Sequence, residues 1–290
     1  MSGVTQILLV GCGKMGSAML AGWRSQGIAA EEVVVVEPAE ELARQIVERH
    51  AVTVVSGAAD IPEGFSPAIV IFAVKPQMMD AAVPDYTGFI KNGAMALSIA
   101  AGKTLGYFER HFGAGCAVVR TMPNTPAAVG RGITALYANA HATSEQKAAA
   151  EALLQAVGET VWLEEEGQMD AVTALSGGGP AYVFLLIETM TKAGVAAGLP
   201  EDVAAKLAHA TVCGAGELAR LADEPPEQLR KNVTSPGGTT LEALNVLMAE
   251  EGIQPLFDRA IAAATRRSRG GRGWSTRGWR VRDVRKELKS

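Results

Sequence analysis

The 290-residue chain is poor in aromatic residues and in cysteine, and both shortages restrict what kind of protein it can be. Aromatic residues make up only 5% of the chain while alanine is abundant, a composition that suits tightly packed helices. The three cysteines, Cys12, Cys116 and Cys213, lie far apart and show neither metal nor redox spacing. The four histidines are equally scattered. We therefore expect reduced thiols and no metal site.

The chain also lacks long apolar runs. The run from Ile7 to Val10 is short and ends in glycines, so we expect no signal peptide. No uninterrupted apolar stretch has the length that a bilayer span requires. We therefore expect a soluble, cytoplasmic protein without a membrane partner, long enough to form two domains.

Positive charge is scarce except at the end of the sequence. Residues 266–290 hold ten Lys or Arg against two acidic residues, a formal charge of +8, which leaves −12 on the rest. A basic segment with Trp274 and Trp279 could contact nucleic acid. Four glycines between Gly270 and Gly278 interrupt any regular element there, and no recognition motif accompanies the charge. We predict a flexible basic tail over residues 270–290 and no nucleic-acid partner.

A strand-like apolar run at residues 5–10 leads into a G-x-G-x-x-G loop at residues 11–16. A helical pattern and a second apolar run, residues 33–36, complete a βαβ unit. In this context the first glycine permits a tight turn, the second lets a pyrophosphate approach the backbone, and the third lets helix and strand pack closely. The predicted cofactor contacts here are Gly11, Gly13, Lys14, Met15 and Gly16.

An acidic residue, Glu37, follows the second apolar run, 26 positions after Gly11. A carboxylate at this place accepts hydrogen bonds from both ribose hydroxyls, whereas it would repel a 2′-phosphate. The sequence therefore predicts NAD(P)H as the cofactor, with a preference for NADH.

A buried strand over residues 69–74 is ended abruptly by Lys75 and Pro76. Open α/β sheets bind ligands at the carboxyl ends of their strands, so we expect Ala73, Val74, Lys75 and Pro76 to border the cofactor. Lys75 could instead be a solvated surface lysine.

The alternation of strands and helices ends near Glu165, and nearly everything after Gly167 is helical. We predict a Rossmann-type α/β domain with a parallel sheet at residues 1–165 and an all-α domain at residues 166–269. Residues 181–187 are almost unbroken apolar sequence. Because a helix that is apolar all round needs neighbours on every side, we infer a dimer with interleaved helices.

Residues 232–248 read N-V-T-S-P-G-G-T-T-L-E-A-L-N-V-L-M, a polar turn that opens a helix. The first amides of that helix, near Gly238, have no intrahelical acceptor and favour a carboxylate. The hydroxyls of Ser235 and Thr240 stand beside them. An ordinary capped helix with a glycine-rich entry is the alternative interpretation.

This string resembles the signature of the pyrroline-5-carboxylate reductase family, and A-V-K-P-Q at residues 73–77 and M-P-N-T-P at residues 122–126 match it as well. The resemblance covers about residues 5–269. It implies reduction of L-1-pyrroline-5-carboxylate to L-proline by hydride transfer from NAD(P)H, the last step of proline biosynthesis. It also implies dimers that often form larger rings.

The resemblance implies roles for individual residues. Catalysis falls to Thr240 and Ser235, with Thr240 bonding the ring nitrogen or delivering its proton. The substrate carboxylate lies on the turn, and the expected substrate contacts are Glu166, Gly238 and Thr239. Asn124 and Asn232 lie near the cofactor, although Asn124 could simply initiate a turn and Glu166 could belong to a solvated charge run.

A glycine-rich segment, residues 177–180, keeps a second enzyme class open. Hydroxyacid dehydrogenases join a Rossmann domain to helices and generally carry a lysine one turn after such a segment, because they need a base for the alcohol proton. Val183 stands at that place here, and Lys192 lies about three turns beyond Pro180. A cyclic imine needs no such base. The sequence therefore favours imine reduction.

A protein that senses a dinucleotide or an amino acid without turnover is a third possibility. Such a sensor would not need the complete turn from Ser235 to Thr240, so the intact turn favours an enzyme.

Overall fold

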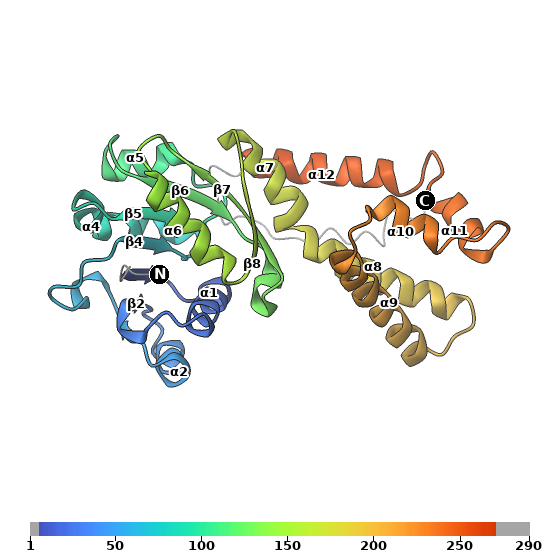
Figure 1. Ribbon diagram of the computed structural model, residues 1–290, viewed down its shortest axis with the longest axis horizontal. Helices are drawn as coiled ribbons and strands as arrows, with labels where there is room; N and C mark the ends of the chain where they lie inside the picture. Colours follow the sequence, from blue (N-terminus) through green and yellow to red (C-terminus); the bar gives the residue numbers. More distant parts are fainter. Residues whose placement is uncertain (1–5, 271–290) are drawn as a thin grey trace, which may run out of the picture.

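The computed structural model describes residues 6–270, and the predicted basic tail lies outside them apart from Gly270. A strand-rich part and a helical part lie next to each other (Figure 1). The strand-rich part ends with a strand at Trp162, and from Glu166 on the elements are helical.

Eight strands form one sheet in the order β3-β2-β1-β4-β5-β6-β7-β8. All neighbours are parallel except β6 and β7, so the expected parallel sheet is confirmed with one antiparallel exception. The sequence patterns did not predict β3. The strands are β1 (Ile7–Val10), β2 (Val33–Val36), β3 (Thr53–Val55), β4 (Ile69–Phe72), β5 (Met95–Ser98), β6 (Val118–Met122), β7 (Gly132–Ala138) and β8 (Gly158–Trp162).

The central strands are buried on both faces because helices cover each side of the sheet. Successive residues of β1 therefore enter different cores: Leu9 shares one with Trp23 and Leu154, whereas Leu8 shares the other with Phe108. The first core is covered by α1 (Lys14–Ser25), α2 (Glu40–His50) and α6 (Ser144–Gln155), and the second by α3 (Met79–Ala82), α4 (Thr87–Lys91) and α5 (Leu105–Phe112).

The helical part begins with a long run that a π-helix interrupts at residues 173–177. Its last helix returns to the start of that run, where the Ser268 hydroxyl donates to Asp170 Oδ1 at 2.6 Å (Figure 1). The sequence patterns did not predict the π-helix or α10. The helices are α7 (Met169–Val172), α8 (Gly179–Ala196), α9 (Glu201–Leu221), α10 (Pro226–Asn232), α11 (Thr239–Leu247) and α12 (Ile253–Gly270).

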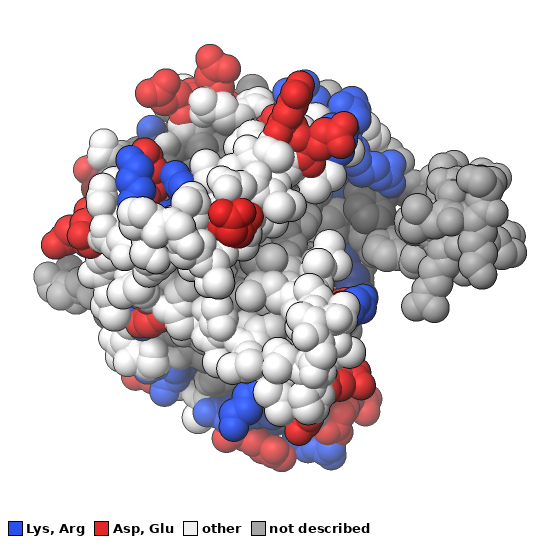
Figure 2. All heavy atoms as spheres, turned by 90° about the vertical axis from the view of Figure 1, so that its right-hand side faces the viewer, with Lys and Arg blue, Asp and Glu red and all other residues white. Residues whose placement is uncertain are grey.

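The helical part exposes an unusual amount of apolar surface. Within residues 6–270, none of α8, α10, α11 and α12 has a fully buried residue. Phe184 is 61% exposed and Leu207 is 53% exposed. Figure 2 shows a largely uncharged face here, with most acidic and basic side chains around its margin.

Contrary to the expectation from uninterrupted runs, the helical segment from Glu166 to Ala196 is long and apolar enough on average to cross a bilayer. Length and composition alone are weak evidence for a span.

Candidate functional site

The glycines of the loop between β1 and α1 differ in how closely their surroundings approach them. Gly11 has φ +85°, and a Cβ there would lie 2.7 Å from Val74 Cγ1. At Gly16 a Cβ would lie 2.7 Å from the Gly11 carbonyl oxygen. At Gly13, among the described residues, it would meet nothing within 4 Å. The first and third glycines therefore serve close packing, while Gly13 leaves its surroundings open.

Among residues 6–270, no side chain caps the start of the helix that follows this loop. Gly13 is the N-cap of α1 and has no side chain to bond the first amides, which continue through Lys14 and Met15. These amides and the helix dipole suit a pyrophosphate, and the open space at Gly13 lets it approach. The chain therefore fits a dinucleotide at this loop.

Glu37 is fixed beside the same loop. Its Oε2 accepts a hydrogen bond from the Cys12 amide at 3.0 Å, and its Oε1 accepts one from the Ala39 amide at 3.1 Å. Burial raises the pKa of the Cys12 thiol to about 11, so this neighbour stays a neutral thiol. The carboxylate of Glu37 thus has a defined position at the end of β2, where a ribose would lie.

The loops after β4 and β5 are tied together at the carboxyl edge of the sheet. Lys75 begins the 3₁₀ turn that follows β4. Lys103, after β5, lies 2.6 Å from Asp80 Oδ1 and 4.2 Å above the centroid of the Tyr107 ring. The hydrogen bond from Lys103 is the main reason that the pKa of Asp80 is lowered. The sequence reasoning missed this cluster because its members are far apart along the chain.

Glu166 takes part in a buried ion pair where the two parts meet. Its Oε1 accepts from Arg120 Nη1 at 2.9 Å and from the Leu105 amide at 2.8 Å. The Arg120 side chain is only 6% exposed and that of Glu166 is 28% exposed. Sequence reasoning singled out Glu166 and missed Arg120, which is hidden in an apolar strand pattern. The carboxylate therefore joins β6, the start of α5 and the start of the helical part.

Asn124 bridges the two parts at a second point. Its Nδ2 donates to the Ser176 carbonyl at 3.3 Å, and its Oδ1 accepts from the Ile133 amide at 3.0 Å. The residue begins the 3₁₀ helix η5 (Thr125–Val129), which is the turn that the sequence left open as an alternative.

The predicted substrate turn joins α10 to α11. Gly237 has φ +69°, and the Gly238 amide donates to the Ser235 carbonyl at 3.0 Å. Gly238 is the N-cap of α11, so the amides around Thr239 and Thr240 again have no side-chain cap. Both threonines are exposed.

Asn232 ends α10 instead of lying in the turn. Its Oδ1 accepts from Gln228 Nε2 at 2.7 Å, a bond within the helix.

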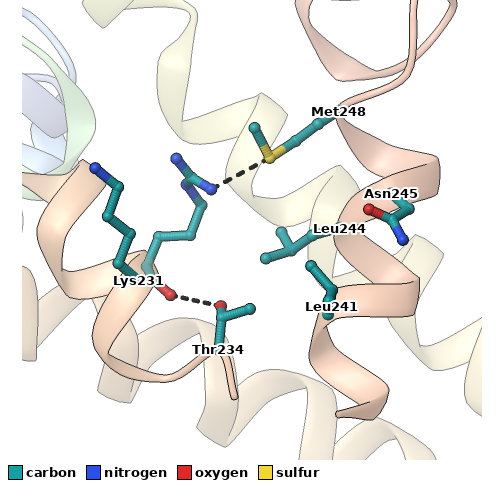
Figure 3. Close-up of a pocket in the computed structure, with 7 residues that line it drawn as sticks. Lys231, Thr234, Leu241, Leu244, Asn245 and Met248 are labelled. Carbon is teal, nitrogen blue, oxygen red and sulfur yellow. Dashed lines mark hydrogen bonds between the residues drawn. The ribbon is translucent and has the colours of Figure 1, made fainter. Parts of the chain in front are cut away.

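A hollow of about 390 Å³ lies between α10 and α11, next to the turn. Figure 3 shows Leu241, Leu244 and the polar Asn245 on the α11 side, with Lys231 on α10 and Thr234 just after α10. Arg230 Nη1 lies 3.3 Å from Met248 Sδ across it. The lining residues are Arg230, Lys231, Thr234, Leu241, Leu244, Asn245 and Met248.

The turn at residues 235–240 and the glycine loop at residues 11–16 lie in different parts of the molecule, far from each other in space. In Figure 1 the helices α10 and α11 are well separated from the loop between β1 and α1. A separation seen in projection can only be larger in space, so one chain does not bring its own turn to its own loop.

The predominantly parallel sheet, the glycine loop and the acidic residue after β2 define a dinucleotide-binding protein of the Rossmann class. Two family descriptions agree: "Pyrroline-5-carboxylate reductase dimerisation" matches residues 166–270, and "NADP oxidoreductase coenzyme F420-dependent" matches residues 6–102.

Individual proteins of known identity resemble the chain over most of its length. The pyrroline-5-carboxylate reductase of Pseudomonas aeruginosa is 39% identical over 263 residues, covering 91% of this chain and 95% of that protein. The one from Synechocystis sp. is 40% identical over 267 residues, covering 91% and 97%. The structure of the Coxiella burnetii pyrroline-5-carboxylate reductase matches with a TM-score of 0.87 at 31% identity, covering 92% of this chain and 98% of that one.

The chain therefore belongs to the pyrroline-5-carboxylate reductase family. The expected reaction, reduction of L-1-pyrroline-5-carboxylate to L-proline by hydride transfer from NAD(P)H, is confirmed.

Proposed function

We propose that the turn from Ser235 to Thr240 holds the substrate and that Thr240 acts on its ring nitrogen. The uncapped, exposed start of α11 carries this proposal, because its amides can bind the imine carboxylate. Ser235, Gly238 and Thr239 would contact that carboxylate. Loss of NADH absorbance in the presence of L-1-pyrroline-5-carboxylate tests the proposal, with the Thr240 variants treated in the Discussion.

The chemistry asks little of the protein beyond positioning. The imine nitrogen is basic enough to be protonated near neutral pH, so no base is needed to start the reaction. NAD(P)H supplies the hydride when bound. We propose that Gly11, Gly13 and Gly16 lie against the pyrophosphate of the cofactor, with further contacts through Lys14, Met15, Ala73, Val74, Lys75 and Pro76. We also propose that Glu166 lies beside the substrate and that Asn232 lies beside the cofactor.

Self-association would complete the site. Since the turn and the glycine loop of one chain are far apart, the turn of a second copy must reach the loop of the first. The match to a dimerisation family over residues 166–270 supports association through the helical part. We accordingly propose that the helical segment from Glu166 to Ala196 faces another subunit and no bilayer, and that the protein works in the cytoplasm.

Charge placed on the exposed apolar face should separate the subunits. We expect the unaltered protein to scatter light as a dimer or a larger ring. Phe184→Asp should shift it towards the monomer and abolish reductase activity, because a buried charge without a partner opposes association. Ala152→Asp, on the exposed face of α6, adds the same charge as a control and should change neither property. A monodisperse, active monomer at micromolar concentration contradicts the proposal.

We further propose that Glu37 gives the enzyme a preference for NADH. Its two anchored oxygens place a negative charge where a 2′-phosphate would lie. Glu37→Ser should raise the NADPH rate relative to the NADH rate by about 10-fold, equivalent to about 1.4 kcal/mol. The measurement compares initial rates with both reductants at equal low concentration. Glu40→Ser removes a nearby exposed carboxylate as a control, and a clear NADPH preference of the unaltered enzyme defeats the argument.

A further inference from the structure

The π-helix between α7 and α8 leaves one of its carbonyl groups without a helical partner. In an α-helix the Ser176 carbonyl would accept from residue 180, but Pro180 has no amide hydrogen. The next candidate, the Ala181 amide, donates instead to the Gly178 carbonyl at 3.0 Å. The Ser176 carbonyl is therefore left open to a donor from outside its own helix.

Asn124 supplies that donor from the other part of the protein. Its Nδ2 lies 3.3 Å from the Ser176 carbonyl oxygen, while its Oδ1 accepts from the Ile133 amide at 3.0 Å. Each end of the side-chain amide is thus bound to protein. This geometry points away from a direct cofactor contact and towards a mechanical link.

The link lies at a place that matters for hydride transfer. Asn124 follows β6, at the carboxyl edge of the half-sheet β4-β5-β6, where a Rossmann fold holds the nicotinamide end of its cofactor. Ser176 belongs to the π-helix from which α8 and the rest of the helical part continue. Single π-helical turns occur frequently at functional sites.

We propose that Asn124 is a positioning residue: through the Ser176 carbonyl it fixes the helical part against the carboxyl end of β6 and so sets the geometry at the nicotinamide end of the cofactor site. Because Pro180 has no amide hydrogen, the Ser176 carbonyl lacks its helical donor, and Asn124 donates to it instead. A small loss of alignment between donor and acceptor lowers the rate of a transfer step far more than it lowers binding.

A neighbouring carbonyl in the same π-helix provides a matched control. The Ala174 carbonyl accepts from the Tyr182 hydroxyl at 2.9 Å, and Tyr182 lies in α8, within the same helical run. Tyr182→Phe therefore removes a donor from the π-helix without cutting a link between the two parts. A merely structural role for Asn124 would make the two substitutions equivalent.

The experiment compares Asn124→Ala, Asn124→Asp and Tyr182→Phe in the full-length enzyme by kcat, NADH affinity and thermal stability. The aspartate variant keeps the acceptor for the Ile133 amide and replaces the donor to Ser176 by a negatively charged oxygen, which cannot bond that carbonyl. We expect kcat to fall about 10-fold in both Asn124 variants. In Asn124→Ala the dissociation constant for NADH should stay within about 2-fold of the unaltered value. Tyr182→Phe should lower thermal stability and leave kcat unchanged.

Three results would overturn the proposal. If the NADH affinity of Asn124→Ala falls by as large a factor as its kcat, the residue is a direct cofactor contact. An equal loss of kcat in Tyr182→Phe would reduce its role to helix stability. Unchanged kcat in Asn124→Asp would assign the effect to the Ile133 bond. Turnover by the unaltered enzyme, measured alongside, tests the reductase activity separately.

Discussion

Replacing Thr240 by alanine is expected to lower kcat for pyrroline-5-carboxylate reduction by about 10²-fold, the low end of a typical contribution from a proton donor or acceptor. The hydroxyl stands at the exposed start of α11, beside the amides proposed to hold the carboxylate. Its removal would leave the ring nitrogen without its partner while the carboxylate remains bound. The turnover number should therefore fall more than the apparent affinity for the imine.

A control variant and a stability measurement make the result for Thr240→Ala interpretable. Thr240→Ser keeps the hydroxyl and should retain most of the activity. Because Thr240 is exposed, the alanine variant should melt close to the temperature of the unaltered protein. If turnover is unchanged in Thr240→Ala, the residue has no part in the mechanism.

Replacing Glu166 by alanine is expected to destabilise the protein by about 3 kcal/mol, the low end for breaking a buried ion pair. The Arg120 guanidinium, with its side chain 6% exposed, would lose its counter-charge. The partial exposure of Glu166 lets water replace it in part, which places the effect at that low end. Thermal denaturation followed by circular dichroism measures the loss.

A double variant separates the structural role of Glu166 from its predicted contact with substrate. Arg120→Met with Glu166→Leu removes both charges and should recover most of the stability, because apolar pairs often replace buried ion pairs at little cost. If Glu166 also contacts the imine, the recovered protein should remain impaired in substrate binding. Full activity in the double variant would leave Glu166 only a structural role, through its bonds to Arg120 and to the Leu105 amide.

The sequence was sufficient for the elements whose pattern is local. The apolar run before Gly11, the glycine spacing and the run at residues 33–36 follow rules that span a few dozen residues, and the resulting βαβ unit is confirmed. The change to helices after Gly167 was equally visible. Short β3 was missed because three residues of strand carry little periodicity.

The site required information that a sequence does not carry locally. That β7 runs antiparallel to β6 depends on the short η5 turn, whose proline and glycine signals are also compatible with other connections. Arg120 and Glu166 are 46 positions apart, and only the fold brings them together. Pro180 lies in the glycine-rich segment that the sequence patterns placed within one helical stretch, and Asn124, which bonds the carbonyl that Pro180 cannot, could not be identified from spacing. The assigned roles of Ser235, Gly238, Thr239 and Thr240 remain predictions.

Within the described part of the chain, the helices α8, α10, α11 and α12 have no fully buried residue, and the stability of their fold depends on this. If their apolar faces find cover only against another polypeptide, the folded state of this half is shared between molecules. Dilution then weakens it by mass action, and assembly contributes a bimolecular step to the production of each active centre.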